Sequence, residues 1–500
     1  MSAFSDARAV PAGSTLETDL AIIGGGPAGI TLALALAEMP VRILMLESGG
    51  TSFDDKTQAL YDGTQTGVRY TPLDATRQRY LGGSTNHWGG WCRPLDVTDF
   101  EARSWVPNSG WPFPKSEIEP HFARAQALVE AGGFNYGANT KPWRDQYGDP
   151  IALGAGGVYT SWFEFSKMRG SVLPTNFGER YADDLKRLPN LKLMLHANVT
   201  NIALAQDAGS VDHLDVATLT GRKFKVKARH VVLATGGIEN ARILLASNGV
   251  MKQGVGNGYG LVGRYFMDNP IPRQTAKLVV FGGALAPYYT DNRQGADAIF
   301  RATFAPSEDY KRKSHVMGSL TTVENPVDLD AFGQAAVAAT AAALGVDASG
   351  AKAYSLGCGM ELKPDPDRRF TLTDKRDALG MPRLNLHMTI YDEDFALYRD
   401  TMKELGRQLL AARVGMIHLD RKSRESWLET MDWGNHHIGT TRMHVDPRQG
   451  VVDANLKVHG IGNLFIAGSS VFPTCGASNP TLNLLAVTLR LAGHLKGLFR

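Results

Sequence analysis

The order of apolar and polar positions predicts short buried strands that alternate with helices. Residues 20–23 and 41–46 are largely apolar runs, and an apolar helical stretch lies between them. Short apolar runs of this kind are typical of strands that are buried on both faces of a parallel sheet. Residues 17–50 therefore predict a strand–helix–strand unit of an α/β protein.

The same pattern returns in two later parts of the chain. Residues 228–234 predict a buried strand, which the turn Thr235-Gly236-Gly237 connects to a helix over residues 238–246. Residues 463–468 predict another short strand, and a helix is predicted around residues 482–495. We expect these distant segments to join the N-terminal unit, which makes that domain discontinuous.

The segments between these strand–helix units differ from them in composition and pattern. Residues 101–185 are rich in Trp, Phe and Pro, whereas the later part alternates like a strand at 383–388 and contains helical segments at 331–344 and 393–413. These regions predict an inserted α+β domain that binds substrate. The expected division gives the first domain residues 1–100, 186–270 and 426–500, and gives the inserted domain residues 101–185 and 271–425.

The turn after the first strand has a glycine pattern that favours dinucleotide binding. Gly24, Gly26 and Gly29 occupy the three glycine positions of GxGxxG, with Pro27 and Ala28 before the last one. The first glycine allows a tight turn, the second lets the backbone approach a pyrophosphate, and the third packs helix against strand. The N–H groups at the start of the helix then point at the phosphates.

Two other segments belong to the same prediction. Glu47 ends the second strand, about where an acidic residue meets the ribose hydroxyls in such folds. Residues 191–201 predict a single strand that covers the adenine and includes Val199.

Composition excludes several classes. The formal charge of +3, from 53 basic and 50 acidic residues, gives no reason to expect nucleic acid or an acidic membrane surface as partner. No apolar run reaches the roughly 18 residues of a membrane-spanning helix. The N-terminal residues show no export signal, so we expect a cytoplasmic protein, with export alongside a partner subunit left open.

The three cysteines give no sign of a metal or redox centre. Cys92, Cys358 and Cys475 lack a CxxC partner, which argues against zinc, a disulfide framework and a dithiol centre. The sequence also lacks CxxCH and any cysteine cluster, so neither a haem nor an iron–sulfur site is predicted.

Several further motifs resemble the glucose–methanol–choline (GMC) oxidoreductases. Residues 80–94, which contain Gly82-Gly83-Ser84-Thr85-Asn86-His87-Trp88, are similar to the flavin-contacting loop of that family. The C-terminal stretch is similar to the family at residues 436–443, 450–453, 458–464, 468–473 and 476–482. The resemblance covers the nucleotide domain well and the substrate domain poorly. It implies FAD as cofactor and places the chain nearest to the bacterial glucoside 3-dehydrogenase and pyranose oxidase-like branch.

The resemblance also implies which residues form the site. His436 and Asn479 occupy the two catalytic positions. The predicted cofactor-binding residues are Gly24, Gly26, Pro27, Ala28, Gly29, Glu47, Gly83, Ser84, Asn86, His87, Val199, Thr235, Gly236, Gly468, Asn479, Pro480 and Thr481. His87 aligns with the histidine that bonds the flavin covalently in some relatives, and packing without a bond is the alternative.

These residues predict oxidation of a ring secondary alcohol of a sugar or glycoside to a ketone. A base must take the hydroxyl proton as hydride moves to flavin N5, and a neutral imidazole such as His436 suits that role. Asn479 is expected to hold the same hydroxyl, and aromatic residues between Trp105 and Phe163 are expected to contact the sugar. A quinone, a redox protein or oxygen would then accept the electrons.

Alternatives remain at each position. His436 and His437 could both be core or surface histidines, and Asn479 could be only the N-cap of the last helix. Arg442 is expected to be structural, pairing with a carboxylate or the C-terminal motif. A non-sugar alcohol and a non-catalytic FAD-binding role are the alternative functions. The absence of paired cysteines argues against a flavoprotein disulfide reductase, and an NAD-dependent dehydrogenase leaves the C-terminal motifs unexplained.

Overall fold

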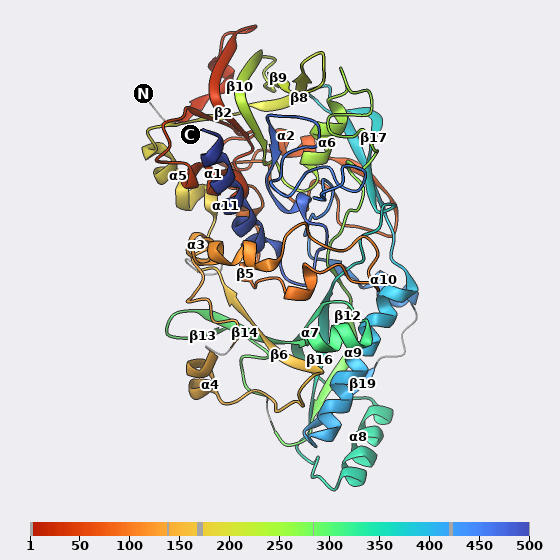
Figure 1. Ribbon diagram of the computed structural model, residues 1–500. Coiled ribbons are helices and arrows are strands. Elements are labelled where there is room, and N and C mark those ends of the chain that lie inside the picture. Colours follow the sequence, from red (N-terminus) through yellow and green to blue (C-terminus); the bar gives the residue numbers. More distant parts are fainter. Residues whose placement is uncertain (1–3, 138–139, 168–173, 284, 420–423, 500) are drawn as a thin grey trace.

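Two large sheets at opposite ends of the molecule define its architecture (Figure 1). The computed structural model describes residues 4–137, 140–167, 174–283, 285–419 and 424–499. Each large sheet has eight strands, and two smaller sheets of three and two strands complete the fold.

The first sheet is built around parallel strands from distant parts of the chain. Its strands are β1 (Phe4–Asp6), β2 (Thr15–Ile23), β3 (Ile43–Leu46), β7 (Leu191–Leu195), β8 (Asn198–Leu204), β9 (Val211–Ala217), β10 (Lys223–Leu233) and β21 (Leu464–Ile466). Strand β10 pairs with β2 along one edge, while β9 and then β21 pair along the other. The parallel strands are buried where β2 pairs with β3, over residues 20–23 and 43–46, and where β10 pairs with β21, over residues 231–233 and 464–466, as their apolar sequences predict.

Helices cover this sheet. Helix α1 (Pro27–Ala35) follows β2, α6 (Glu239–Ala246) follows β10, and α11 (Pro480–Leu498) packs against α1. The predicted strand–helix units therefore form, within a few residues of the expected bounds.

The prediction of one strand over residues 191–201 is wrong. The chain turns at His196, which has a positive φ of 59°, so the segment divides into β7 and β8. Strand β7 pairs in parallel with β3, whereas β8 pairs antiparallel with β9.

The second sheet is antiparallel and forms the opposite end of the molecule (Figure 1). Its strands are β5 (Trp91–Cys92), β6 (Val158–Phe165), β12 (Arg273–Val280), β13 (Arg293–Gln294), β14 (Ile299–Pro306), β15 (Ser319–Val327), β16 (Lys352–Met360) and β19 (Gly415–Leu419). Helix α9 (Asp392–Ala411) packs against β19, and α8 (Ala331–Leu344) has the bounds expected for the Ala-rich segment. The arrangement confirms an α/β fold with a discontinuous Rossmann-like domain and an inserted α+β region.

Some segments inside the expected insertion contact the first sheet's helices instead. The hairpin β17 (Arg369–Arg376) and β18 (Pro382–Met388) pairs with β4 (Gly63–Gly67) and contacts α6. Helix α3 (Phe122–Leu128) packs against α11, and α5 (Phe177–Arg187) packs against α1. The domain boundaries given by the sequence remain a prediction.

The remaining elements are short. They are α2 (Asp55–Gln58), α4 (Lys141–Tyr147), α7 (Glu308–Ser314), α10 (Arg424–Glu429), and the strand pair β11 (Pro270–Ile271) and β20 (Asp432–Trp433). Within the residues that the structure describes, no helix combines the length and the apolar character needed to cross a bilayer.

Candidate active site

A cavity of about 930 Å³ is lined by residues of both large sheets. One part is lined by Gly24 after β2 and Thr235 after β10, and the other by Arg301 of β14 and Thr322 of β15. The volume is of the size that binds cofactors and substrates.

The glycine turn forms the wall at the start of α1. Gly24 has a positive φ of 105°, and a Cβ atom on Gly29 would lie 2.0 Å from the carbonyl oxygen of Gly24. Gly26 is the N-cap of α1, and no side chain caps the helix there. A Cβ on Gly26 would find no neighbour closer than 3.9 Å, so the backbone is open to a ligand.

Glu47 connects the end of β3 to this turn. Its carboxylate accepts hydrogen bonds from the backbone N–H groups of Gly25, at 2.7 Å, and Gly49, at 2.8 Å. The buried side chain also lines the cavity, where its oxygens can accept hydrogen bonds from hydroxyl groups.

The cavity walls leave backbone open where a dinucleotide could approach closely. Gly236 and Gly468 both line the cavity, and a Cβ on either residue would meet no atom within 4 Å. The backbone is thus open to close approach at two further places, each directly after a strand of the first sheet. FAD, whose phosphates and rings need such exposed backbone, fits this part of the cavity.

Most of the predicted cofactor residues line the cavity. Gly29 and Asn86 do not. Gly29 lies against the turn, as its packing role requires, and Asn86 donates from its side chain to the carbonyl oxygen of Leu81, which stabilises the loop instead. His87, in the same loop, is accessible from the cavity, and desolvation by the surrounding protein lowers its pKa.

A buried ionic cluster in the cavity wall was missed by sequence analysis. Arg77 and Arg79 place their guanidinium carbons 3.8 and 4.6 Å from the ring centre of Tyr61. Arg79 also donates to Glu239 at 3.0 Å, and all four residues line the cavity. Glu239 is far from the two arginines in the sequence, so the cluster could not be predicted from spacing. The one available signal was the presence of two arginines directly before the glycine loop.

The two predicted catalytic residues lie together. The amide nitrogen of Asn479 is 3.0 Å from Nε2 of His436, and both residues line the cavity. Asn479 occupies the N-cap position of α11, yet its side chain makes no capping hydrogen bond. Its amide is directed to the histidine, so capping does not account for this residue.

Asn269 fixes the tautomer of His436. The amide nitrogen of Asn269 donates to the carbonyl oxygens of Met360, at 2.9 Å, and Gly476, at 2.8 Å. Its amide oxygen must therefore be the atom 2.7 Å from Nδ1 of His436, and because this oxygen only accepts, Nδ1 carries the hydrogen. Nε2 therefore keeps its lone pair, which accepts a hydrogen bond from the amide N–H of Asn479 at 3.0 Å.

Burial sets the protonation of this region. Desolvation lowers the pKa of His436 to about 4, so the ring is neutral at ordinary pH. Burial also raises the pKa of Asp268 to about 7, although Tyr70 and the backbone N–H groups of Asn269 and His436 donate to its carboxylate. Asp268 thus lies behind the histidine as a second group that titrates near neutrality.

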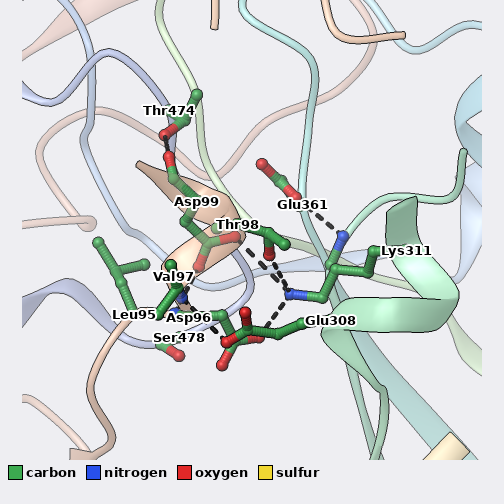
Figure 2. Close-up of polar contacts among 12 residues, drawn as sticks. Leu95, Asp96, Val97, Thr98, Asp99, Glu308, Lys311, Glu361, Thr474 and Ser478 are labelled. Carbon is green, nitrogen blue, oxygen red and sulfur yellow. Dashed lines mark hydrogen bonds and ion pairs between the residues drawn. The ribbon is translucent and has the colours of Figure 1, made fainter. Parts of the chain in front are cut away.

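The segment around residues 93–99 holds the loop that carries Asn479. Arg93 donates to Oγ of the neighbouring Ser478 at 2.7 Å and to Asp96 at 2.6 Å. Figure 2 shows the buried Lys311 of α7 directed at the same segment, with its Nζ atom 2.5 Å from Asp96 and 3.1 Å from Thr98. Burial alone would raise the pKa of Asp96, but Arg93 and Lys311 hold it below its usual range.

The expected aromatic contacts are largely wrong. Of the aromatic residues singled out between Trp105 and Phe163, Phe163 lines the cavity, whereas Trp111 and Trp143 are core residues. Trp143 stacks on Phe300, with ring centres 4.1 Å apart, because that face of the second sheet is turned away from the cavity. The aromatic residues of the cavity wall are instead Tyr61, Tyr80, Trp88, Trp91, Phe163 and Trp433.

Two neighbouring predictions concern Arg442 and His437. Arg442 donates to the backbone oxygen of Asn108 and lies 4.5 Å from the ring centre of Tyr265, rather than pairing with a carboxylate. His437 is buried at the cavity wall, and desolvation brings its pKa well below the usual value.

Comparisons with known proteins agree with this geometry. A family model described as GMC oxidoreductase matches residues 364–488. The fructose dehydrogenase large subunit of Gluconobacter japonicus is 27% identical, over 54% of this chain but only 47% of that protein. A 2-methyl-1,2-propanediol dehydrogenase of Mycolicibacterium austroafricanum is 24% identical over 97% of this chain and 96% of that protein. A C-glycoside 3-oxidase of Microbacterium trichothecenolyticum is 26% identical over 61% of this chain and 54% of that protein.

The fold has a counterpart among solved structures. A formate oxidase structure superposes with a TM-score of 0.60 at 19% identity, over 98% of this chain and 99% of that one. The fold, the matching C-terminal family model and the cavity open to FAD are consistent with one another. Residues 364–488 are therefore similar to the GMC oxidoreductases, the fold is that of such an enzyme, and FAD is the cofactor that the cavity and these similarities support.

Proposed function

We propose that this protein oxidises a ring secondary alcohol of a sugar or glycoside to a ketone, with His436 as the base. The observation that carries the proposal is the 3.0 Å contact between Nε2 of His436 and the amide of Asn479 at the cavity wall. Asn269 keeps hydrogen on Nδ1, so Nε2 can accept the hydroxyl proton once the substrate hydroxyl replaces the Asn479 amide as its partner.

Different residues of this chain would hold the cofactor and act on the substrate. The start of α1, Glu47 and the open backbone at Gly236 and Gly468 would hold FAD, which supplies a hydride acceptor at flavin N5 when bound. The substrate hydroxyl would take the place of the Asn479 amide N–H at Nε2 and give its proton to that atom, while the displaced amide nitrogen would donate to the substrate oxygen. The His436 ring is already held through Nδ1 before substrate arrives, so only the Asn479 side chain has to move.

Relatives favour a sugar. Similarity to a fructose dehydrogenase and to a C-glycoside 3-oxidase supports a sugar or glycoside, and the second supports carbon 3 over carbon 2. The wall also offers hydrogen-bonding groups at Thr322, Asn325 and Glu324, which suit a substrate with several hydroxyls.

A non-sugar alcohol is the second candidate. The match to 2-methyl-1,2-propanediol dehydrogenase extends over almost the whole of both proteins, unlike the matches to the fructose dehydrogenase large subunit and to the C-glycoside 3-oxidase of Microbacterium trichothecenolyticum. The apolar wall formed by Trp91, Phe163 and Leu320 would accept a smaller alcohol.

Anaerobic flavin bleaching separates the two candidates. The purified yellow protein is mixed without oxygen with a panel of sugars, glycosides and simple alcohols, and flavin absorbance is followed. We expect sugars or glycosides to bleach the flavin. Bleaching by simple alcohols alone would favour the second candidate, and a flavin that no alcohol reduces would refute both. Turnover with a quinone dye, with oxygen and with a redox protein then identifies the acceptor.

A second proposal is that His87 forms a covalent bond to the flavin. Desolvation lowers the pKa of His87, and its access to the cavity would let a ring nitrogen bond to the C8α methyl carbon of the flavin. One methyl hydrogen and the imidazole N–H hydrogen would then pass to the flavin ring as two protons and two electrons, and the reduced flavin would be reoxidised by the electron acceptor of the enzyme. Acid precipitation tests this bond. Yellow colour in the pellet indicates covalent FAD, and colour wholly in the supernatant indicates that His87 only packs against the cofactor.

A further inference from the structure

Arg301 stands out in the part of the cavity that the second sheet forms. On β14 it pairs directly with Phe163 of β6, so both side chains are on the same face of the sheet, and both line the cavity. Thr322 and Glu324 alternate along β15 on the cavity side as well. Gly359 of β16 adds no side chain, and a Cβ there would meet no atom within 4 Å.

The acidic groups near Arg301 are already engaged. Asp291 and Glu324 are the carboxylates whose charge acts on it. Asp291 accepts a hydrogen bond from Arg293 at 3.0 Å, and Glu324 accepts one from Arg273 at 2.5 Å. Among the residues that the structure describes, no carboxylate lies within ion-pair distance of Arg301.

The Arg301 guanidinium is held in place, but only some of its hydrogen-bond donors have partners. One terminal nitrogen donates to the carbonyl oxygen of Val323 at 2.6 Å, and the group lies 5.7 Å from the ring centre of Trp91. Its Nε atom is buried and has no hydrogen-bond partner among the described residues. A guanidinium has five N–H donors, and a buried donor without a partner is costly, so this one is arranged for a ligand.

We propose that Arg301 binds an anionic oxygen group of the substrate, so that the substrate is a sugar acid or its glycoside rather than a neutral sugar. This inference rests on the proposed function and specifies its substrate class. The planar fork of an arginine matches a carboxylate with two parallel hydrogen bonds, and Trp91 keeps that fork in one orientation. A neutral hydroxyl in the same place would leave the positive charge uncompensated.

A matched pair of ligands tests the proposal. Methyl β-D-glucuronide and methyl β-D-glucoside differ only at carbon 6, which carries a carboxylate in the first and a hydroxymethyl group in the second, and their binding to the protein loaded with chemically reduced FAD is measured without oxygen by calorimetry. We expect the glucuronide to bind at least roughly 10-fold more tightly. Arg301→Gln should weaken glucuronide binding roughly 10- to 100-fold and leave glucoside binding unchanged, while Arg301→Lys keeps part of the preference. Arg407→Gln, at an exposed arginine of α9, is the control.

The outcomes separate this inference from the proposed function. Equal binding of the two ligands, no binding of either, or an Arg301→Gln variant that weakens both equally would overturn the role of Arg301. If the glucoside still bleaches the flavin, the proposed alcohol oxidation stands even though the role of Arg301 is wrong. Conversely, preferred binding of the glucuronide through Arg301 without bleaching by any alcohol supports the anion site and refutes the proposed reaction.

Discussion

Asn269 determines which ring nitrogen of His436 can accept a proton. Its amide is fixed by two backbone carbonyls, so its oxygen holds the hydrogen on Nδ1. We predict that Asn269→Leu retains FAD but slows flavin reduction roughly 10- to 100-fold, less than loss of the base itself. Stopped-flow absorbance measures this rate. Asn385→Leu, on β18 outside the cavity, is the control, and an unchanged rate in Asn269→Leu would contradict the tautomer argument.

Two titrating groups predict the pH profile. The rate of flavin reduction should fall as pH approaches 4, because burial lowers the pKa of His436 to about 4 and the protonated ring accepts no proton. The rate should rise as pH passes about 7, since Asp268, whose pKa burial raises to about 7, then gains a negative charge that stabilises the imidazolium. Asp268→Asn should remove the step near 7 and keep the one near 4. A profile unchanged by this substitution would show that Asp268 has no electrostatic role.

At the scale of elements, helix α7 supports the loop that carries Asn479. Lys311 is buried and contacts Asp96 (Figure 2). Arg93 donates both to Asp96 and to Ser478, and so connects Lys311 to the loop. Lys311→Met removes the cation and leaves buried carboxylates without it, so the free energy of unfolding should fall by about 3–5 kcal/mol. Urea denaturation followed by circular dichroism measures this. Lys313→Met, at an exposed lysine of the same helix, should cost little, and equal stability of the two variants would contradict the account.

The sequence predicted elements better than it predicted the surroundings of the site. Strands β2, β10 and β21 and helix α11 follow from apolar periodicity and glycine turns, which are local signals. Residues such as Asn269 and Arg301 could not be assigned, because their roles arise from pairing between strands that are distant in the sequence. The aromatic residues near Trp143 were misplaced because composition does not reveal which face of a strand meets the cavity.

At the scale of the whole molecule, we expect the side of the first sheet to hold the cofactor and the second sheet to contact the part of the substrate away from His436 and Asn479. Two glycines test this separation, since each faces open space without a positive φ. Gly26→Val should fill the space at the start of α1 and lower the FAD content. Gly359→Val, on the second sheet, should retain FAD and raise the KM for substrate. Flavin absorbance per protein and anaerobic reduction rates measure both effects, and loss of FAD in Gly359→Val would contradict the division.

The most direct test is the rate of flavin reduction in His436→Ala. In the proposed mechanism His436 takes the proton, whereas the glycine turn and Glu47 would hold the cofactor, so the two functions should separate. We predict normal FAD content and reduction by substrate that is slower by roughly 10²–10⁴-fold. Asn479→Ala should also slow flavin reduction, and the double variant should be slowed by less than the product of the two single effects. His387→Ala, at a half-buried histidine of β18, is the control. Near-normal reduction in His436→Ala would contradict the account, and His437 would then be the next candidate base.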